Sequence, residues 1–246
     1  MKLPEQSLTS INKDLIKEFS SRKDIALVAA TKYIDANIIR ELVKQGVKDI
    51  GENRIKDFEK EYAELKDYLK QNKCRLHFIG HLQSNKAKKA VEMFDVIQSI
   101  DSEKIAAKVN DIAKEKWKMQ DVMIQVNIGK EEQKYGVMPE NVIEFYEKVK
   151  DFSNINVIGL MCIAPDVCAE PNNNNNNNNN LSPAEQTRPY FRKMKYIFDK
   201  INDSTQRKLK YLSMGMSNDY RIAIEEGSNM IRLGRVLYRG IICACY

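Results

Sequence analysis

The sequence lacks any run of about 18 consecutive apolar residues, the length that a membrane-spanning helix needs. It therefore predicts no contact with a membrane. Residues 1–10 lack both an apolar core and an Arg-rich amphipathic pattern, so we expect neither a signal peptide nor a transit peptide. The expected location is cytoplasmic.

Cysteine and histidine are scarce, and their spacing argues against disulfide or metal chemistry. The five cysteines form no CxxC pair, and an odd number does not suit a disulfide framework. Cys162 has no His or Asp partner nearby in the sequence, which gives a thiol nucleophile little support. His77 and His81 share the same-face spacing of a strand, but no carboxylate or cysteine cluster accompanies them. We expect no metal, and interpret both as hydrogen-bonded residues at the edge of a site.

Charge of one sign is not concentrated in any segment. The net charge is +6, yet basic and acidic residues alternate, as over residues 56–61. This pattern is typical of solvated helix faces with i,i+4 ion pairs, so we expect no nucleic-acid partner. A nucleic-acid-binding module is still an alternative, and its binding would weaken steeply with salt.

The sequence does contain a regular alternation of short apolar runs and longer amphipathic segments. A continuous apolar run such as residues 25–31 is typical of a strand buried on both faces of a parallel sheet. The predicted strands are residues 25–31, 47–50, 76–80, 95–100, 122–128, 157–161, 209–213 and 230–233. The predicted helices that follow them are residues 35–45, 53–70, 84–93, a helix from 102, then 139–151, 186–202, 218–226 and 235–241.

Eight β/α units in 246 residues predict an α/β fold, a single (β/α)8 (TIM) barrel domain over residues 1–246. An extra helix over residues 4–20 precedes the first strand. A doubly wound open sheet is the alternative, but no Gly-x-Gly-x-x-Gly follows strand one. Residues 171–182 include nine consecutive asparagines, which bury nothing apolar, and are predicted to be a disordered loop insertion.

Polar residues at the C-terminal ends of the strands are the candidate site residues, because function in such barrels lies there. Lys32 directly follows the apolar first strand. Partial burial lowers the pKa of an amine, and a neutral amine can attack an aldehyde to form a Schiff base. The alternative is a lysine whose side chain extends from the strand end into solvent.

The ends of strands seven and eight predict an anion site. Residues 213–217 precede a helix, and Ser217 is its predicted N-cap. The last predicted helix begins at Gly234 and Arg235. Gly234 offers a backbone amide that no side chain covers, and Arg235 offers a cation. Barrels often bind phosphate with the loops after these two strands. Arg232 ends strand eight, where it could reach the ring of a bound cofactor; the alternative is a plain capping serine with surface arginines.

Several segments at these strand ends form a specific set in a fixed order. They are Val28–Lys32, Gly51–Asn53, His77–Gln83 with Asn85 and Lys86, Gln125–Asn127, the spaced residues Asn127, Glu131, Lys134 and Gly136, Gly159–Met161, Leu212–Ser217 and Ile231–Gly234. Together they resemble the YggS/PROSC family of pyridoxal 5′-phosphate (PLP) homeostasis proteins. The fold of that family is like the N-terminal barrel of alanine racemase, PLP fold type III.

The resemblance implies a set of PLP contacts. Lys32 would form the internal aldimine. Ser217, Gly234 and Arg235 would surround the phosphate, with Met216 in the same turn as Ser217. Arg232 would lie near the pyridine nitrogen, and Asn53 would lie beside the cofactor. The chain departs from the family at Arg235, where a small hydroxyl residue is usual, and at residues 238–240, where a Phe-Gly pair is usual.

The same resemblance favours a carrier over an enzyme. PLP enzymes pair the ring nitrogen with an acid that keeps it protonated, whereas Arg232 cannot accept that proton. Racemases of this fold also take a base from a second domain, which we do not expect here. We therefore predict PLP buffering and delivery to apo PLP-dependent enzymes, without robust catalysis, by a monomer or weak dimer. The alternative is an amino-acid racemase or decarboxylase.

Overall fold

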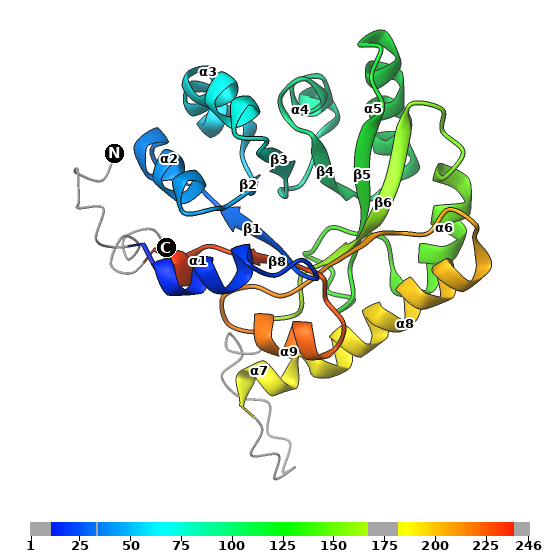
Figure 1. Ribbon diagram of the computed structural model, residues 1–246. Helices are drawn as coiled ribbons and strands as arrows, with labels where there is room; N and C mark the ends of the chain where they lie inside the picture. Colours follow the sequence, from blue (N-terminus) through cyan, green and yellow to red (C-terminus); the bar gives the residue numbers. More distant parts are fainter. Residues whose placement is uncertain (1–10, 33, 167–181, 239–246) are drawn as a thin grey trace.

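The computed structural model describes residues 11–32, 34–166 and 182–238, and its strands form a closed parallel barrel surrounded by helices (Figure 1). Each strand pairs with the next along the chain, and the last pairs with the first. The strands are β1 (Ala26–Ala30), β2 (Asp49–Glu52), β3 (Arg75–Phe78), β4 (Val96–Ile100), β5 (Gln120–Val126), β6 (Ile155–Cys162), β7 (Tyr211–Ser213) and β8 (Met230–Leu233). The predicted barrel is confirmed, and the open doubly wound sheet is wrong.

Helices connect successive strands on the outside of the barrel (Figure 1). The α-helices are α1 (Lys13–Ser20), α2 (Ala36–Lys44), α3 (Ile55–Gln71), α4 (Ala87–Met93), α5 (Glu103–Glu115), α6 (Val142–Val149), α7 (Pro183–Gln186), α8 (Arg188–Ser204) and α9 (Tyr220–Glu225). Short 3₁₀ turns are η2 (Ser84–Lys86), η3 (Pro139–Asn141) and η4 (Arg235–Leu237).

Local sequence signals set several helix ends. The Asp35 side chain accepts the N–H of Asn37 at 2.8 Å at the start of α2, and Ser102 caps α5 in the same way. Gly46 follows α2 with a φ of +103°, the left-handed backbone that favours glycine after a helix.

Some predicted helix boundaries differ from the structure. The helix predicted over 186–202 corresponds to α8, and the short helix α7 that precedes it was not predicted. Of the helix predicted over 235–241, the described part is the single turn η4. Residues 4–10 of the predicted first helix and the asparagine tract lie outside the described residues.

The barrel interior contains an apolar set of side chains and a polar one. The apolar set is Val28, Val96, Met123, Ile158, Met161 and Met230. Among them lie His77, Gln98 and Ser213, all fully buried, and Arg232, which is 4% exposed. Because alternate residues of a strand point to the same face, Met230 and Arg232 of β8 both point inward.

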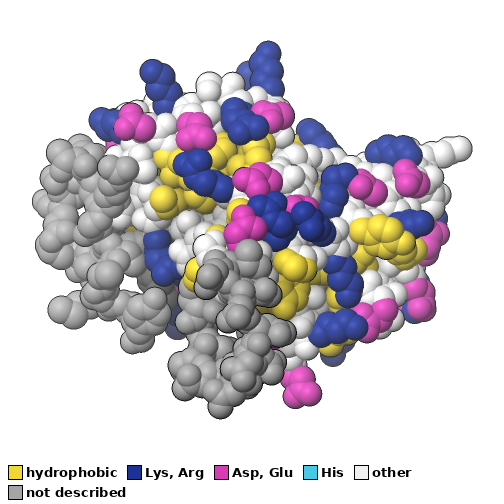
Figure 2. All heavy atoms as spheres, turned by 90° about the horizontal axis from the view of Figure 1, so that it is seen from below, with side chains coloured by type: hydrophobic (Ala, Val, Ile, Leu, Met, Phe, Trp, Pro, Cys, Tyr) yellow, Lys and Arg dark blue, Asp and Glu magenta, His cyan; other side chains and the backbone are white. Residues whose placement is uncertain are grey.

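The surface shows mixed charge. On the face seen from below, basic and acidic side chains lie among one another (Figure 2). No helix in the described part of the chain is both long enough and apolar enough to cross a membrane.

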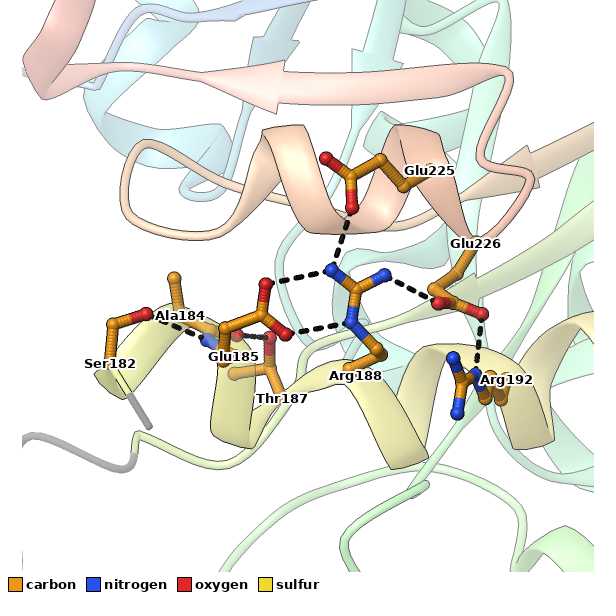
Figure 3. A network of polar contacts seen from close by, with 8 residues as sticks. All are labelled: Ser182, Ala184, Glu185, Thr187, Arg188, Arg192, Glu225 and Glu226. Carbon is orange, nitrogen blue, oxygen red and sulfur yellow. Dashed lines mark hydrogen bonds and ion pairs between the residues drawn. The ribbon is translucent and has the colours of Figure 1, made fainter. Parts of the chain in front are cut away.

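Arg188 ties together the three helices that follow β6 and β7 (Figure 3). Its guanidinium binds Glu185 at 2.7 Å, Glu225 at 2.6 Å and Glu226 at 2.6 Å, and Arg192 also reaches Glu226 at 3.0 Å. These hydrogen bonds, from Glu185 first, raise the pKa of Arg188. The cluster therefore holds α7, the start of α8 and the C-terminal end of α9 together.

Replacing Arg188 with Met should lower the melting temperature, because three neighbouring carboxylates would lose the cation that they share. Arg192→Met is the matched control, since that arginine is 66% exposed and contacts one carboxylate. We expect a clear loss for Arg188→Met, a negligible loss for the control, and a smaller difference in high salt. Equal melting temperatures for both variants in thermal unfolding would contradict the role given to Arg188.

Candidate functional site

The candidate site residues lie at the C-terminal ends of four neighbouring strands, in the order β7, β8, β1 and β2 around the barrel. Closure of the sheet makes these strands adjacent, although they come from opposite ends of the sequence. The structure thus brings the predicted positions to one side of the barrel mouth.

Lys32 follows β1 as an exposed side chain that makes no hydrogen bond or ion pair with any other described residue. The preceding residue, Thr31, is buried and donates its hydroxyl to the carboxylate of Glu52 at the end of β2. Glu52 is 4% exposed, and burial raises the pKa of its carboxyl group from 4.5 to about 8. The Lys32 side chain is thus exposed and not partly buried, and the end of the neighbouring strand holds a buried carboxyl group that is largely neutral at pH 7.

Asn53 continues from Glu52 and is half-buried at the mouth. The chain just after β3 passes very close to it: a Cβ at Gly80 would lie 2.1 Å from the carbonyl oxygen of Asn53. Glycine at position 80 is therefore required for this approach, which fixes Asn53 relative to β3.

The turn after β7 is organised by Asp219. Its carboxylate accepts the N–H of Met216 at 2.6 Å, and burial raises the pKa of this group. Asp219, and not Ser217, occupies the N-cap position of α9, so the predicted capping role of Ser217 is wrong. The reason is that the chain makes a further turn over residues 217–219 before the helix begins.

Ser217 instead joins the two turns of the predicted anion site. Its hydroxyl oxygen accepts the N–H of Val236, in η4, at 3.4 Å. No described residue accepts a hydrogen bond from the N–H groups of Ser217 or Arg235. The two turns therefore lie side by side and leave backbone donors for an anion.

Gly234 lies between these donors and the end of β1. A Cβ there would meet only Ala30, at 3.5 and 3.6 Å, which is ordinary van der Waals contact. Unlike Gly80, this glycine is not required by a close approach of the described chain. The Arg235 side chain is exposed at the rim, and the Met216 side chain is 37% exposed.

Arg232 lies inside the mouth, with both terminal nitrogens engaged. Nη1 donates to Ser213 Oγ at 2.7 Å, and Nη2 donates to the carbonyl oxygen of Cys162 at 2.7 Å. Burial lowers the pKa of Arg232, although an arginine stays protonated at physiological pH. Three of its five N–H groups, the Nε–H among them, have no acceptor among the described residues and are left for a ligand.

Cys162 is fully buried beside this arginine. Burial raises the pKa of its thiol to about 12, so the thiol is protonated at neutral pH. The structure therefore agrees with the weak support that the sequence gives to a thiol nucleophile.

The two histidines lie in different environments. His77 is in the barrel core and not at a site edge, as the sequence suggested; it is fully buried and contacts Gln98 and Asp49. His81 does lie at the rim, where its ring stacks on Tyr135 with centroids 3.4 Å apart. Within residues 11–32, 34–166 and 182–238, no cluster of three or more His, Cys, Asp or Glu side chains could hold a metal.

The loop after β5 contains the spaced set Asn127, Glu131, Lys134 and Gly136. The Asn127 amide donates to the carbonyl oxygens of Glu131 at 2.8 Å and Lys134 at 3.0 Å. Gly136 has a φ of +132°, and a Cβ there would lie 2.5 Å from the Asn127 nitrogen. This set therefore shapes the loop, and Lys134 links it to β6 by donating to Ala164 O at 3.3 Å.

Two features of the site were not predicted: the burial of Glu52 and the contacts of Gln98 with Ser213 and His77. The signal for Gln98 was present, because Gln98 and Ser99 are polar residues between the apolar residues of the run 96–100. Its partners could not be read from the sequence, since each comes from a different strand.

Comparisons with known proteins give one consistent family. The model of the alanine racemase N-terminal domain matches residues 12–241. A pyridoxal phosphate homeostasis protein of Aquifex aeolicus (strain VF5) is 38% identical over 212 residues, which cover 86% of this chain and 85% of that protein. A pyridoxal phosphate homeostasis protein of Synechocystis sp. is 35% identical over 214 residues, covering 87% and 90%.

Solved structures agree with this assignment. PipY of Synechococcus elongatus PCC7942, in a structure with PLP bound, is 29% identical with a TM-score of 0.76, and the match covers 92% of this chain and 98% of that chain. Alanine racemase of Clostridium difficile 630 is 16% identical with a TM-score of 0.64, covering 92% of this chain and 55% of that chain. The racemase likeness shows the fold alone.

Glu52 should make stability depend on pH. Because its folded-state pKa is raised to about 8 from 4.5, the folded protein binds more protons at this site than the unfolded chain between these values. The free energy of unfolding should therefore fall as the pH rises through this window, by an amount on the order of a few kcal/mol.

Glu52→Gln removes this titration but keeps an acceptor for Thr31. We expect the variant to melt at a higher temperature than wild type at pH 8.5, with little difference at pH 5. Glu115→Gln, at an exposed position, is the control and should show no such trend. A Glu52→Gln effect that is the same at both pH values would argue against the shifted carboxyl group.

Proposed function

Because the chain belongs to the family of pyridoxal phosphate homeostasis proteins, which share the fold of the alanine racemase N-terminal domain, we propose that it binds PLP on Lys32 and acts in PLP homeostasis. The bond would be a Schiff base: the Lys32 amine condenses with the aldehyde to form a C=N bond, and water is released. The observation that carries this proposal is the free amine of Lys32 at the same mouth as the unpaired backbone donors of two neighbouring turns.

The residues present fit each part of such a cofactor. The N–H groups of Ser217 and Arg235, with the exposed Arg235 cation, suit a phosphate. Packing of the described chain does not require a glycine at position 234, so the missing side chain leaves room for a ligand beside these donors. An unpaired N–H of Arg232, such as the Nε–H, suits a ring nitrogen that accepts a hydrogen bond. Asn53 and Met216 complete the proposed binding set at the rim.

Arg232 supports a carrier over an enzyme. PLP withdraws electrons most strongly when its ring nitrogen is protonated, which an acidic partner promotes. An arginine is always a donor, so it would leave that nitrogen unprotonated and weaken chemistry at an amino-acid substrate. We therefore propose that the protein holds PLP and releases it to apo PLP-dependent enzymes without robust catalysis.

The proposed setting is the cytosol, with a monomer or weak dimer as the acting species. Cys74 and Cys162 are free thiols, which suits a reducing compartment. The alternative function is that of a racemase or decarboxylase of amino acids, and the shared fold with alanine racemase is the observation in its favour.

Lys32→Ala should abolish covalent PLP binding. The purified protein is incubated with PLP, reduced with borohydride to convert the C=N bond to a stable amine, and measured by intact mass. We expect one PLP-sized adduct on wild type and none on Lys32→Ala, whereas Lys23→Ala, which removes another exposed lysine, should keep it. An adduct that persists on Lys32→Ala would show that the tether is elsewhere.

Turnover separates the carrier from the enzyme. The PLP-loaded protein is given each common amino acid in deuterated water, and exchange of the α-proton and loss of carbon dioxide are measured. We expect less than one turnover per PLP with every amino acid. Sustained multiple turnovers that disappear in Lys32→Ala would establish the racemase or decarboxylase alternative.

A further inference from the structure

A continuous chain of hydrogen bonds runs through the barrel interior from Arg232 to Asp49. We call it the axial chain: Arg232, Ser213, Gln98, His77 and Asp49. Its successive contacts are Arg232 Nη1 to Ser213 Oγ at 2.7 Å, Ser213 Oγ to Gln98 Oε1 at 2.7 Å, Gln98 Nε2 to His77 Nδ1 at 2.9 Å, and His77 Nε2 to Asp49 Oδ1 at 2.8 Å. It crosses β8, β7, β4, β3 and β2 in turn.

The direction of every hydrogen bond in the axial chain follows from its two ends. A guanidinium only donates, so Ser213 must accept from Arg232 and can donate its own proton to Gln98. The Gln98 amide then donates to His77 Nδ1. A carboxylate only accepts, so the Nε2–H of His77 donates to Asp49. The chain therefore assigns one amide orientation to Gln98 and one neutral tautomer to His77.

The far end of the axial chain has its own charge compensation. Arg75 donates to Asp49 Oδ1 at 2.8 Å and to the hydroxyl of Tyr211 at 3.2 Å. Burial disfavours the Asp49 carboxylate, but the hydrogen bond from His77 together with the charge and hydrogen bond of Arg75 outweighs it, so the pKa of Asp49 is lowered. The chain thus ends on a carboxylate that stays ionised.

Packing alone does not account for these residues. Gln98, His77 and Ser213 are fully buried and lie among the valines and methionines of the barrel interior. Burying polar groups is unfavourable unless each is hydrogen-bonded, and an apolar residue of the same size would fill the space without that requirement. What the polar residues add is a fixed orientation for the guanidinium at the mouth.

We propose that Gln98 and His77 are positioning residues, which act through Ser213 to hold Arg232 in the orientation that the cofactor ring requires. This inference rests on the proposed function, in which Arg232 faces the ring nitrogen of PLP. One N–H of Nη1 and one of Nη2 are bound by Ser213 and Cys162, which fixes the guanidinium and leaves the Nε–H among the donors that can meet a ligand. Loss of the Gln98 contacts frees the Ser213 hydroxyl to rotate and loosens the guanidinium.

Gln98→Met tests this role, because Met keeps the volume and removes the amide. The variant is titrated with PLP, and the absorption maximum of the bound cofactor is followed from pH 6 to pH 9. We expect a shifted absorption maximum, an altered pH profile and a dissociation constant raised about tenfold, as for the loss of support to a charged hydrogen bond.

Gln120→Met is the matched control. Gln120 is also fully buried, but its amide binds the carbonyl oxygens of Phe94 and Asp95 outside the axial chain. This variant should lose stability in a similar way yet keep the wild-type spectrum and affinity. Ser213→Ala is a milder second variant; it removes one hydroxyl, should fold, and should reproduce the spectral change of Gln98→Met.

The outcomes separate the two proposals. If wild type forms no adduct on Lys32, the proposed function fails before the axial chain is tested. If wild type binds PLP and both Gln98→Met and Ser213→Ala keep its spectrum, pH profile and affinity within twofold, the positioning role is overturned. If Gln120→Met changes the spectrum as much as Gln98→Met, the effect is general destabilisation and the positioning role is likewise overturned.

Discussion

A guanidinium buried inside a closed barrel is the constraint on which the candidate site depends. Removing a cation from water is unfavourable unless its donors find acceptors and its charge is balanced. Arg232 meets the first requirement with a carbonyl oxygen and a hydroxyl, and the nearby carboxylate of Asp219 favours its charged form. Polar side chains at inward positions of several strands follow from this one buried charge. With an apolar residue at position 232, these buried polar side chains would have no charged group to hold.

Closure of the barrel places the hydrogen-bonded axial chain beside the other candidate site residues. Pairing of β8 with β1 sets Arg232 opposite Val28, four residues before Lys32, and brings Gly234 next to Ala30. The Tyr238 hydroxyl then donates to the carbonyl oxygen of Ala30 at 3.2 Å, across 208 positions of sequence. An open sheet would separate the first and last strands. Lys32 and the two turns with unpaired backbone donors are neighbours only because the sheet closes.

The sequence predicted those parts of the molecule that depend on local pattern. Eight apolar runs with intervening helices gave the barrel, and the caps at Asp35 and Ser102 are encoded within one helical turn. Ser217 was misread, because a turn of three residues separates it from α9 and its hydroxyl bonds to a distant strand end. His77 was placed at the site edge, because its partners, Gln98 and Asp49, lie on two other strands. Hydrogen bonds across a barrel leave no periodic signal in one sequence.

The same buried charge also bears on reactivity. An acidic residue at position 232 would share a proton with the nitrogen of a bound pyridine ring, and it would need no line of acceptors behind it. An arginine there needs that line, and it can offer the ring only a donor. The fold thus maintains four polar residues behind Arg232, and under the proposed function this arginine would meet the cofactor ring without protonating it. Such a site would suit the holding of an aldehyde without its consumption.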